Sequence, residues 1–143
     1  MITNLVIASD HAGYELKNYL IERLKRNNFN PIDLGTNSEE SVDYPNYAHQ
    51  LASKVVNEKL KGILICGSGI GMSMAVNKHK DIRGALCTNT EMAKLSREHN
   101  DANVLILGSR FIQPEQAWEI LDTWLKTDFS GGRHEKRVQA INI

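Results

Sequence analysis

Residues 62–78 read GILICGSGIGMSMAVNK, a short apolar run that ends at Cys66 and passes directly into a loop with a glycine at every second position. Residues 63–65 show no polar alternation, which is typical of a strand covered on both faces in a parallel sheet. The glycines allow a tight turn, and residues 72–77 have the composition of a first helical turn. Because a helix start offers unpaired N–H groups, we expect a thiol beside an anion site.

The same stretch shares features with several other kinds of site. A single cysteine at a strand end is often only a small buried hydrophobe. The spacing G-x-G-x-G differs from the dinucleotide fingerprint G-x-G-x-x-G, and no Walker loop ends in Gly-Lys-Ser/Thr. A thiol phosphatase needs an arginine where Met72 stands, and Cys66 replaces the first glycine of the hydrolase elbow G-x-S-x-G. Spacing therefore excludes the dinucleotide, Walker, phosphatase and hydrolase motifs.

Composition limits the class of protein. A chain of 143 residues suits one domain with a real core. Lysine plus arginine number 17, as do aspartate plus glutamate, so no general basic field recruits nucleic acid. The two cysteines, Cys66 and Cys87, indicate free thiols in a reducing compartment. With no signal peptide and no apolar run near ~18 residues, we expect a cytoplasmic protein that binds neither nucleic acid nor a membrane.

Strand-like and helix-like segments alternate along the chain. Strands are expected at residues 5–8, 30–34, 63–66, 83–87 and 104–107, and helices at about 14–27, 45–58, 72–77, 88–100 and 114–125. In the first helix, leucines at four-residue spacing face the core and charged residues, Lys17 among them, face solvent. The pattern predicts an α/β fold: a three-layer αβα sandwich around a Rossmann-like, doubly wound five-stranded parallel sheet. We expect one domain, 1–143, with a C-terminal arm at about 128–143.

Polar residues follow several of these strands. Asp10 and His11 come after the first strand, Cys66 ends the third, and Arg110 follows the fifth. Ligands of open parallel sheets bind outside the carboxyl ends of the strands. Asp10, or Ser9 before it, could instead only cap the helix that follows.

Three other features allow both a structural and a functional interpretation. Tyr44 opens the second helix, where it either packs or lines the ligand crevice. His99 ends a helix, where a histidine often serves the helix dipole alone. Arg133 and Arg137 are four residues apart and share a face if the tail is helical, which suits a phosphate monoester. The alternative for the tail is a solvated charged end.

Five motifs resemble one known family over essentially the whole chain. They are SDHAGYELK at 9–17, DYP at 43–45, CGSGIGMSMAVNK at 66–78, LSREHNDANVLILGSR at 95–110 and GGRHEKR at 131–137. The chain closely resembles the type B ribose-5-phosphate isomerases, within the wider group of type B ribose and lactose-pathway phosphosugar isomerases. The resemblance implies interconversion of D-ribose 5-phosphate and D-ribulose 5-phosphate in the non-oxidative pentose phosphate pathway. It implies ring opening and C2-to-C1 proton transfer through an enediolate, without a cofactor or a metal.

The resemblance also assigns roles to residues. Cys66 would move the proton, Ser68 would help to move protons between the two substrate oxygens, and His99 would open the ring with Asp10 as its counterpart. Backbone N–H groups from Gly67 through Gly69 to Gly71 would stabilise the enediolate oxygen. The residues implied in binding sugar or phosphate are Asn100, Tyr44, His11, Arg133 and Arg137. A family branch with serine in place of the cysteine has a glutamate base where this chain has Met72, so the chain resembles the cysteine branch.

The family's assembly suggests how the site is completed. In the family, His99, Asn100 and Arg110 would reach the pocket from the neighbouring subunit. We therefore expect a homodimer or a tetramer with shared active sites. Two alternatives remain open: an isomerase of a six-carbon phosphosugar such as allose 6-phosphate or galactose 6-phosphate, and a phosphosugar-binding module without catalysis. The lactose-pathway enzymes divide their catalytic residues between two chains, whereas this chain carries Cys66 and His99 together.

Overall fold

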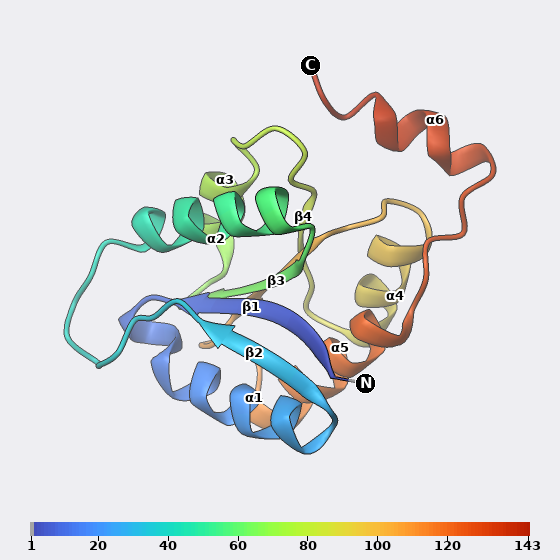
Figure 1. Ribbon diagram of the computed structural model, residues 1–143. Coiled ribbons are helices and arrows are strands. Elements are labelled where there is room, and N and C mark those ends of the chain that lie inside the picture. The colour runs from blue at the N-terminus through green and yellow to red at the C-terminus, as the bar shows by residue number, and fades with distance from the viewer. Residues whose placement is uncertain (1) are drawn as a thin grey trace.

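The computed structural model describes residues 2–143 and contains a five-stranded parallel sheet between two layers of helices (Figure 1). The strands are β1 (Thr3–Ser9), β2 (Phe29–Asp33), β3 (Lys61–Cys66), β4 (Gly84–Leu86) and β5 (Val104–Gly108). Their order is β2-β1-β3-β5-β4, and all neighbours are parallel. The predicted αβα sandwich is confirmed, and the chain changes direction across the sheet between β1 and β3, the position where ligands bind in doubly wound folds.

The helices cover both faces of the sheet. They are the 3-10 turn η1 (His11–Gly13) and helices α1 (Tyr14–Arg26), α2 (Tyr44–Glu58), α3 (Ile70–Val76), α4 (Thr90–Glu98), α5 (Pro114–Lys126) and α6 (Arg133–Gln139). Helices α1, α4 and α5 pack on one face, and α2 and α3 pack on the other. Predicted boundaries differ from these by a few residues at most, because helix and strand ends depend on local capping.

The core follows from strand geometry. Successive side chains of a strand point to opposite faces, so Leu5 and Ile7 of β1 join the core beneath α1, α4 and α5. Val6 and Ala8 join the core beneath α2 and α3. Trp124 is completely buried in the core beneath α1, α4 and α5.

Lys17 corrects one expectation about α1. Its side chain is 1% exposed, and its Nζ lies 2.8 Å from both carboxylate oxygens of Asp33. The prediction of a solvent-facing Lys17 was wrong because the carboxylate at the end of β2 supplies a partner, and a buried ammonium is tolerated only when it is paired. The pair joins α1 to β2.

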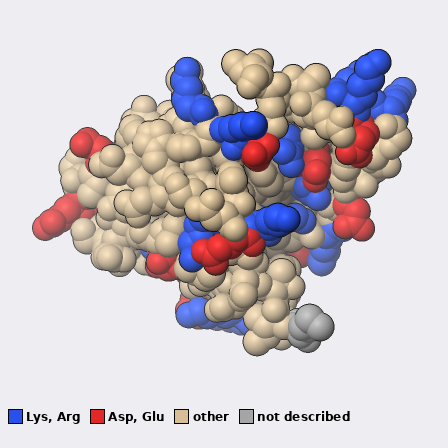
Figure 2. All heavy atoms as spheres, turned by 45° about the horizontal axis from the view of Figure 1, so that its top comes forward, with Lys and Arg blue, Asp and Glu red and all other residues tan. Residues whose placement is uncertain are grey.

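The C-terminal arm, residues 128–143, lies apart from the three layers. Helix α6 has no buried residue and lies at the upper right of Figure 1, while β1 and β2 run towards the left. Figure 2 shows Lys and Arg side chains gathered at the upper right, in the region of α6. Among residues 2–143, no helix combines the length and the apolar character that crossing a membrane requires.

The predicted site residues lie at two edges of the sheet. At the carboxyl edge the strands end, and at the amino edge they begin. The pairing of β3 with β5 runs from Gly62 opposite Val104 to Cys66 opposite Gly108. At ~3.3 Å per residue, the two edges are about 15 Å apart.

Candidate active site

Three polar segments meet at the carboxyl edge. Asp10 and His11 follow β1, Cys66 ends β3, and Arg110 follows β5. These three strands are adjacent in the sheet. The N–H of Asp10 donates to the carbonyl of Ile65 at 3.2 Å, so the turn after β1 is fixed directly beside the cysteine.

The thiol of Cys66 is held by the loop that follows it. The side chain is buried, and the N–H of Gly69 donates to Sγ at 3.2 Å. Gly69 has φ +79°, and a Cβ there would lie 2.5 Å from Leu86. Only glycine allows both this left-handed backbone and this close approach. The Ser68 hydroxyl accepts from the N–H of Ile70 at 3.1 Å, which fixes it beside the thiol.

The loop also presents donors that the rest of the protein does not use. Among residues 2–143, the N–H groups of Gly67, Ser68 and Gly71 make no hydrogen bond. Three free donors close to one thiol are suited to a negatively charged oxygen. These donors belong to the loop backbone. We do not attribute the arrangement to a helix dipole, because α3 is only seven residues long.

Arg110 lies against the same loop of its own chain. Its guanidinium carbon lies 2.9 Å from the position that a Cβ on Gly67 would occupy, and its N–H donates to the Gly67 carbonyl at 2.9 Å. The resemblance assigned Arg110 to the neighbouring subunit. The structure differs, since β5 and β3 are adjacent and the residue after β5 therefore meets the loop after β3.

The remaining residues at this edge have fixed positions. The Tyr44 ring lies 2.5 Å from where a Cβ on Gly71 would be, yet the residue is 38% exposed, so it packs on the loop and also faces solvent. The Asp10 Oδ1 accepts from the N–H of Gly13 at 3.1 Å, as the capping interpretation expected. The His11 Nδ1 accepts from the N–H of Val42 at 3.2 Å, so in the neutral ring the proton is on Nε2.

The other predicted residues lie at the amino edge. His99 ends α4, and its ring stacks on that of His134 with centroids 4.3 Å apart and planes 15° apart. Asn100 follows His99 and is exposed, as are Arg133 and Arg137 of α6. Sequence reasoning did not select His134. Its place between Arg133 and Arg137 in the GGRHEKR motif was the available signal.

The α6 region is strongly cationic. Desolvation lowers the pKa of His134, and nearby His99, Arg133 and Arg137 lower it further. The lowered pKa favours the uncharged form of the His134 ring that stacks on His99. The positive charge of this cluster comes from the two arginines, which is suited to a phosphate dianion.

The arginines divide into paired and unpaired ones. Arg23, Arg83 and Arg97 each form an ion pair within the chain. In contrast, no carboxylate among residues 2–143 pairs with Arg110, Arg133 or Arg137, which have their charges free for a ligand. The unpaired set contains the three that the sequence selected and Arg26, an exposed residue of α1. Over the same residues, no group of three or more His, Cys, Asp or Glu side chains is arranged to hold a metal ion.

A single chain does not bring the two groups together. Cys66, Ser68, Asp10 and His11 lie at one edge of the sheet, and the His99 group lies at the other, about 15 Å away along the strands. Aldose–ketose chemistry needs a base, an acid and a phosphate clamp around one small sugar. The predicted site residues therefore form two separate groups, one at each edge, and we call these groups half-sites.

Comparisons with known proteins agree with the motifs. The sequence profile described as Ribose/Galactose Isomerase matches residues 5–141. Ribose-5-phosphate isomerase B of Escherichia coli is 45% identical over 138 residues, which cover 96% of this chain and 93% of that protein. A putative sugar phosphate isomerase of Bacillus subtilis is 48% identical, with 96% and 94% covered.

Solved structures give the same result. Ribose-5-phosphate isomerase B of Mycoplasma genitalium, with bound ribulose-5-phosphate, is 44% identical with a TM-score of 0.94 over 99% of this chain and 95% of that one. The Thermotoga maritima protein is 47% identical with a TM-score of 0.96 over 98% and 97%. Profile, sequence and structure therefore agree, and this chain belongs to the ribose/galactose isomerase family.

Proposed function

We propose that this protein interconverts D-ribose 5-phosphate and D-ribulose 5-phosphate by proton transfer through an enediolate. The observation that carries the proposal is the Cys66 loop, in which a buried thiol lies beside three unused N–H donors. A relative of the same fold binds ribulose-5-phosphate. Together they favour an aldose–ketose isomerase over a binding module, which needs no base.

The proton transfer is assigned to the carboxyl edge. Cys66, as the thiolate, removes the proton from C2 of the open-chain aldose, and the electron pair of that bond forms the enediolate. The same proton is then returned to C1, which produces the ketose. The free N–H groups of Gly67, Ser68 and Gly71 stabilise the negative oxygen. The Ser68 hydroxyl moves the proton between the oxygens on C1 and C2.

Ring opening and phosphate binding are assigned to both edges. His99 protonates the ring oxygen, with Asp10 as its counterpart at the sugar hydroxyl, and Asn100 binds the sugar. Arg133 and Arg137, together with His11, Arg110 and Tyr44, surround the phosphate end and the wall of the pocket. The absence of internal ion pairs at these arginines within residues 2–143 supports their role.

A second copy of the chain would complete each site. Because the two half-sites are on opposite edges, we propose a homodimer in which the His99 group of one subunit covers the Cys66 loop of the other. Large apolar side chains are exposed near both half-sites, as a subunit interface requires. They are Ile70, Met74, Met92, Leu95 and Phe111. A tetramer would be two such dimers.

Mixing two inactive variants tests the shared site. Cys66→Ala and His99→Asn subunits, mixed and allowed to exchange, form hybrid dimers with one site that has both an intact cysteine and an intact histidine. Activity should return to roughly a quarter of the normal value at equal amounts, as random pairing requires. If both groups acted within one chain, no hybrid would have an intact site and no activity would return.

The substrate is tested by a direct assay. The purified protein is supplied with ribose 5-phosphate and, in parallel, allose 6-phosphate, each with and without a chelator. We expect fast conversion of the ribose ester that the chelator does not change. Conversion of the six-carbon ester alone would contradict the proposed substrate but not the base. Binding of both esters without turnover would contradict catalysis.

A further inference from the structure

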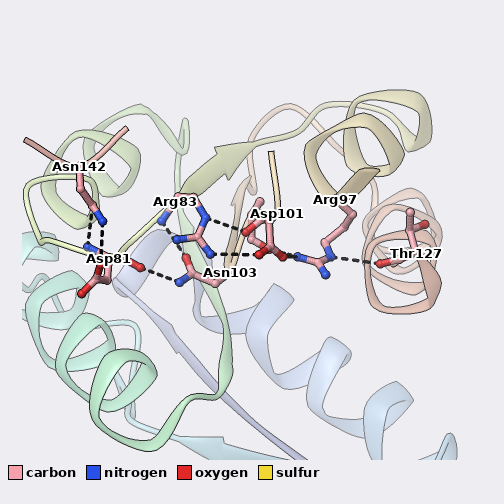
Figure 3. A network of polar contacts seen from close by, with 8 residues as sticks. Asp81, Arg83, Arg97, Asp101, Asn103, Thr127 and Asn142 are labelled. Carbon is pink, nitrogen blue, oxygen red and sulfur yellow. Dashed lines mark hydrogen bonds and ion pairs between the residues drawn. The ribbon is translucent and has the colours of Figure 1, made fainter. Parts of the chain in front are cut away.

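A continuous polar network crosses the amino edge of the sheet and joins both ends of the C-terminal arm (Figure 3). One end of the network is Thr127, the residue before the arm. The other end is Asn142, the second residue from its end. Figure 3 shows the intervening side chains in an unbroken row between these two residues.

The first half of the network is buried. Arg97 is 7% exposed in its side chain and donates to the Thr127 carbonyl at 3.1 Å, to Asp101 Oδ1 at 2.9 Å and to the Ala102 carbonyl at 2.7 Å. Arg83 Nε donates to the carbonyl of the same Asp101 at 2.9 Å. This half fixes the start of the arm to the α4–β5 connection.

The second half lies nearer the surface. The N–H of Arg83 donates to Asn103 Oδ1 at 2.7 Å, and Asn103 Nδ2 donates to the Asp81 carbonyl at 2.8 Å. Asn142 then pairs with Asp81 twice. Its Nδ2 donates to Asp81 Oδ1 at 2.7 Å, and its Oδ1 accepts from the Asp81 N–H at 3.1 Å. We call this pair the C-terminal latch.

The arm has few other attachments. Helix α6 has no buried residue, and between the two ends the arm is held by the His99–His134 stack and by the Ser130 N–H, which donates to the Glu98 carbonyl at 3.0 Å. A segment with so little buried surface has low local stability. Within its own chain, the position of the arm therefore depends on these few attachments.

We propose that Asp81 and Asn142 are positioning residues that hold the arm so that Arg133 and Arg137 are preorganised for the substrate phosphate. The proposal rests on the proposed function, in which these arginines bind phosphate. Neither latch residue is among those assigned to substrate binding or catalysis. A loosened arm would have to be ordered during binding, and that cost weakens affinity more than it changes the chemical step.

The test uses the whole protein and the variant Asn142→Ala. We expect KM for ribose 5-phosphate to rise by roughly three- to tenfold with kcat nearly unchanged, the size of effect that loss of two exposed hydrogen bonds produces. Trypsin cleaves after arginine and lysine, so cleavage at Arg133, Lys136 and Arg137 reports arm mobility independently of activity. Mass spectrometry should show faster cleavage at these sites and unchanged cleavage elsewhere.

Two further variants separate the latch from general damage. Asn30 donates to Asn4 at 2.9 Å in an exposed pair far from the arm, so Asn30→Ala is the matched control and should change neither KM nor arm cleavage. The double variant Asp81→Asn/Asn142→Asp exchanges amide and carboxylate while it keeps both hydrogen bonds, so it should restore KM and protection. Asp81 has φ +68°, a conformation that asparagine also tolerates.

The outcomes distinguish this proposal from the proposed function. Unchanged arm cleavage in Asn142→Ala would overturn the latch. Faster cleavage with normal KM would overturn its positioning role. If Arg137→Ala itself leaves KM unchanged, the phosphate assignment fails, whatever the latch does. Faster cleavage, raised KM and recovery in the exchanged pair together would support the proposal.

Discussion

The carboxyl and amino edges of the sheet use polar groups in opposite ways. At the carboxyl edge, three loop N–H groups and the Arg110 guanidinium have no partner among residues 2–143. At the amino edge, Arg83, Arg97 and Asp101 satisfy one another and nearby carbonyls. Unsatisfied groups are available to a ligand, whereas satisfied groups hold the protein together.

The contrast predicts different consequences of mutation. A change at the carboxyl edge should reduce turnover and leave stability nearly normal. A change within the paired network should reduce stability. The C-terminal arm combines the two features. Its arginines have no ion pair, whereas hydrogen bonds at Thr127 and Asn142 hold its two ends.

The largest effect is expected at Cys66. Cys66→Ala removes the group that we propose moves the proton, so kcat should fall by about 10³-fold. Binding of ribose 5-phosphate should change little, because the N–H donors and arginines are intact. Steady-state kinetics and calorimetric titration measure the two quantities. Normal turnover would show that Cys66 is not the base.

The next effect is expected at Arg97, and it concerns stability. Arg97→Ala removes three hydrogen bonds from a buried guanidinium, and Asp101 can be partly rehydrated. The free energy of unfolding should fall by about 2–3 kcal/mol, measured by urea denaturation. The control Lys126→Ala breaks an exposed pair with Asp122 and should change stability by less than about 0.5 kcal/mol. Equal losses in the two variants would contradict the comparison.

A smaller effect is expected at Arg137. Arg137→Ala should raise KM for ribose 5-phosphate about tenfold and weaken competitive inhibition by inorganic phosphate, since one charge-assisted contact is lost. Unfolding should be nearly unchanged because the side chain is exposed. Lys136→Ala, at an exposed position next to Arg137 in α6, is the matched control. Unchanged phosphate inhibition in Arg137→Ala would exclude the arm from the phosphate site.

The smallest effect concerns the second cysteine. Desolvation by burial raises the pKa of Cys87 from 9.0 to about 11, and the neighbouring Ser96 side chain opposes this rise. The folded protein thus retains a proton that the unfolded chain loses, so stability is unaffected below about pH 8 and falls as pH rises. The loss should reach about 1 kcal/mol by about pH 10. Cys87→Ala should remove this part of the pH dependence, whereas Cys66→Ala should keep it.

Much of the carboxyl edge was predictable from sequence because its signals are local. An apolar run that ends in Cys66 and a loop of alternating glycines follow one another in the chain. Parallel strands bring the residues after β1, β3 and β5 to one edge. Asp10, Cys66 and Arg110 therefore lie on three adjacent strands, as their positions in the sequence indicated.

Contacts between distant segments were not predictable. Lys17 has the helical position of a surface residue, and only Asp33 at the end of β2 makes its burial possible. A side chain at position 71 would collide with the Tyr44 ring. A side chain at position 108 would collide with the Ser68 carbonyl, which lies 2.4 Å from where a Cβ would be. A single sequence gives no signal for such pairs, because each depends on how separate elements pack.

Periodicity and short motifs were sufficient to predict the fold class, the thiol loop and the resemblance to phosphosugar isomerases. The tertiary structure alone decided that His99 and the arm lie at the edge opposite Cys66 and that the latch joins residues 81 and 142. The difference arises because these interactions act over different distances along the chain. Backbone propensity and glycine freedom act over a few residues, whereas hydrogen-bond partners and burial are fixed only when distant segments pack together.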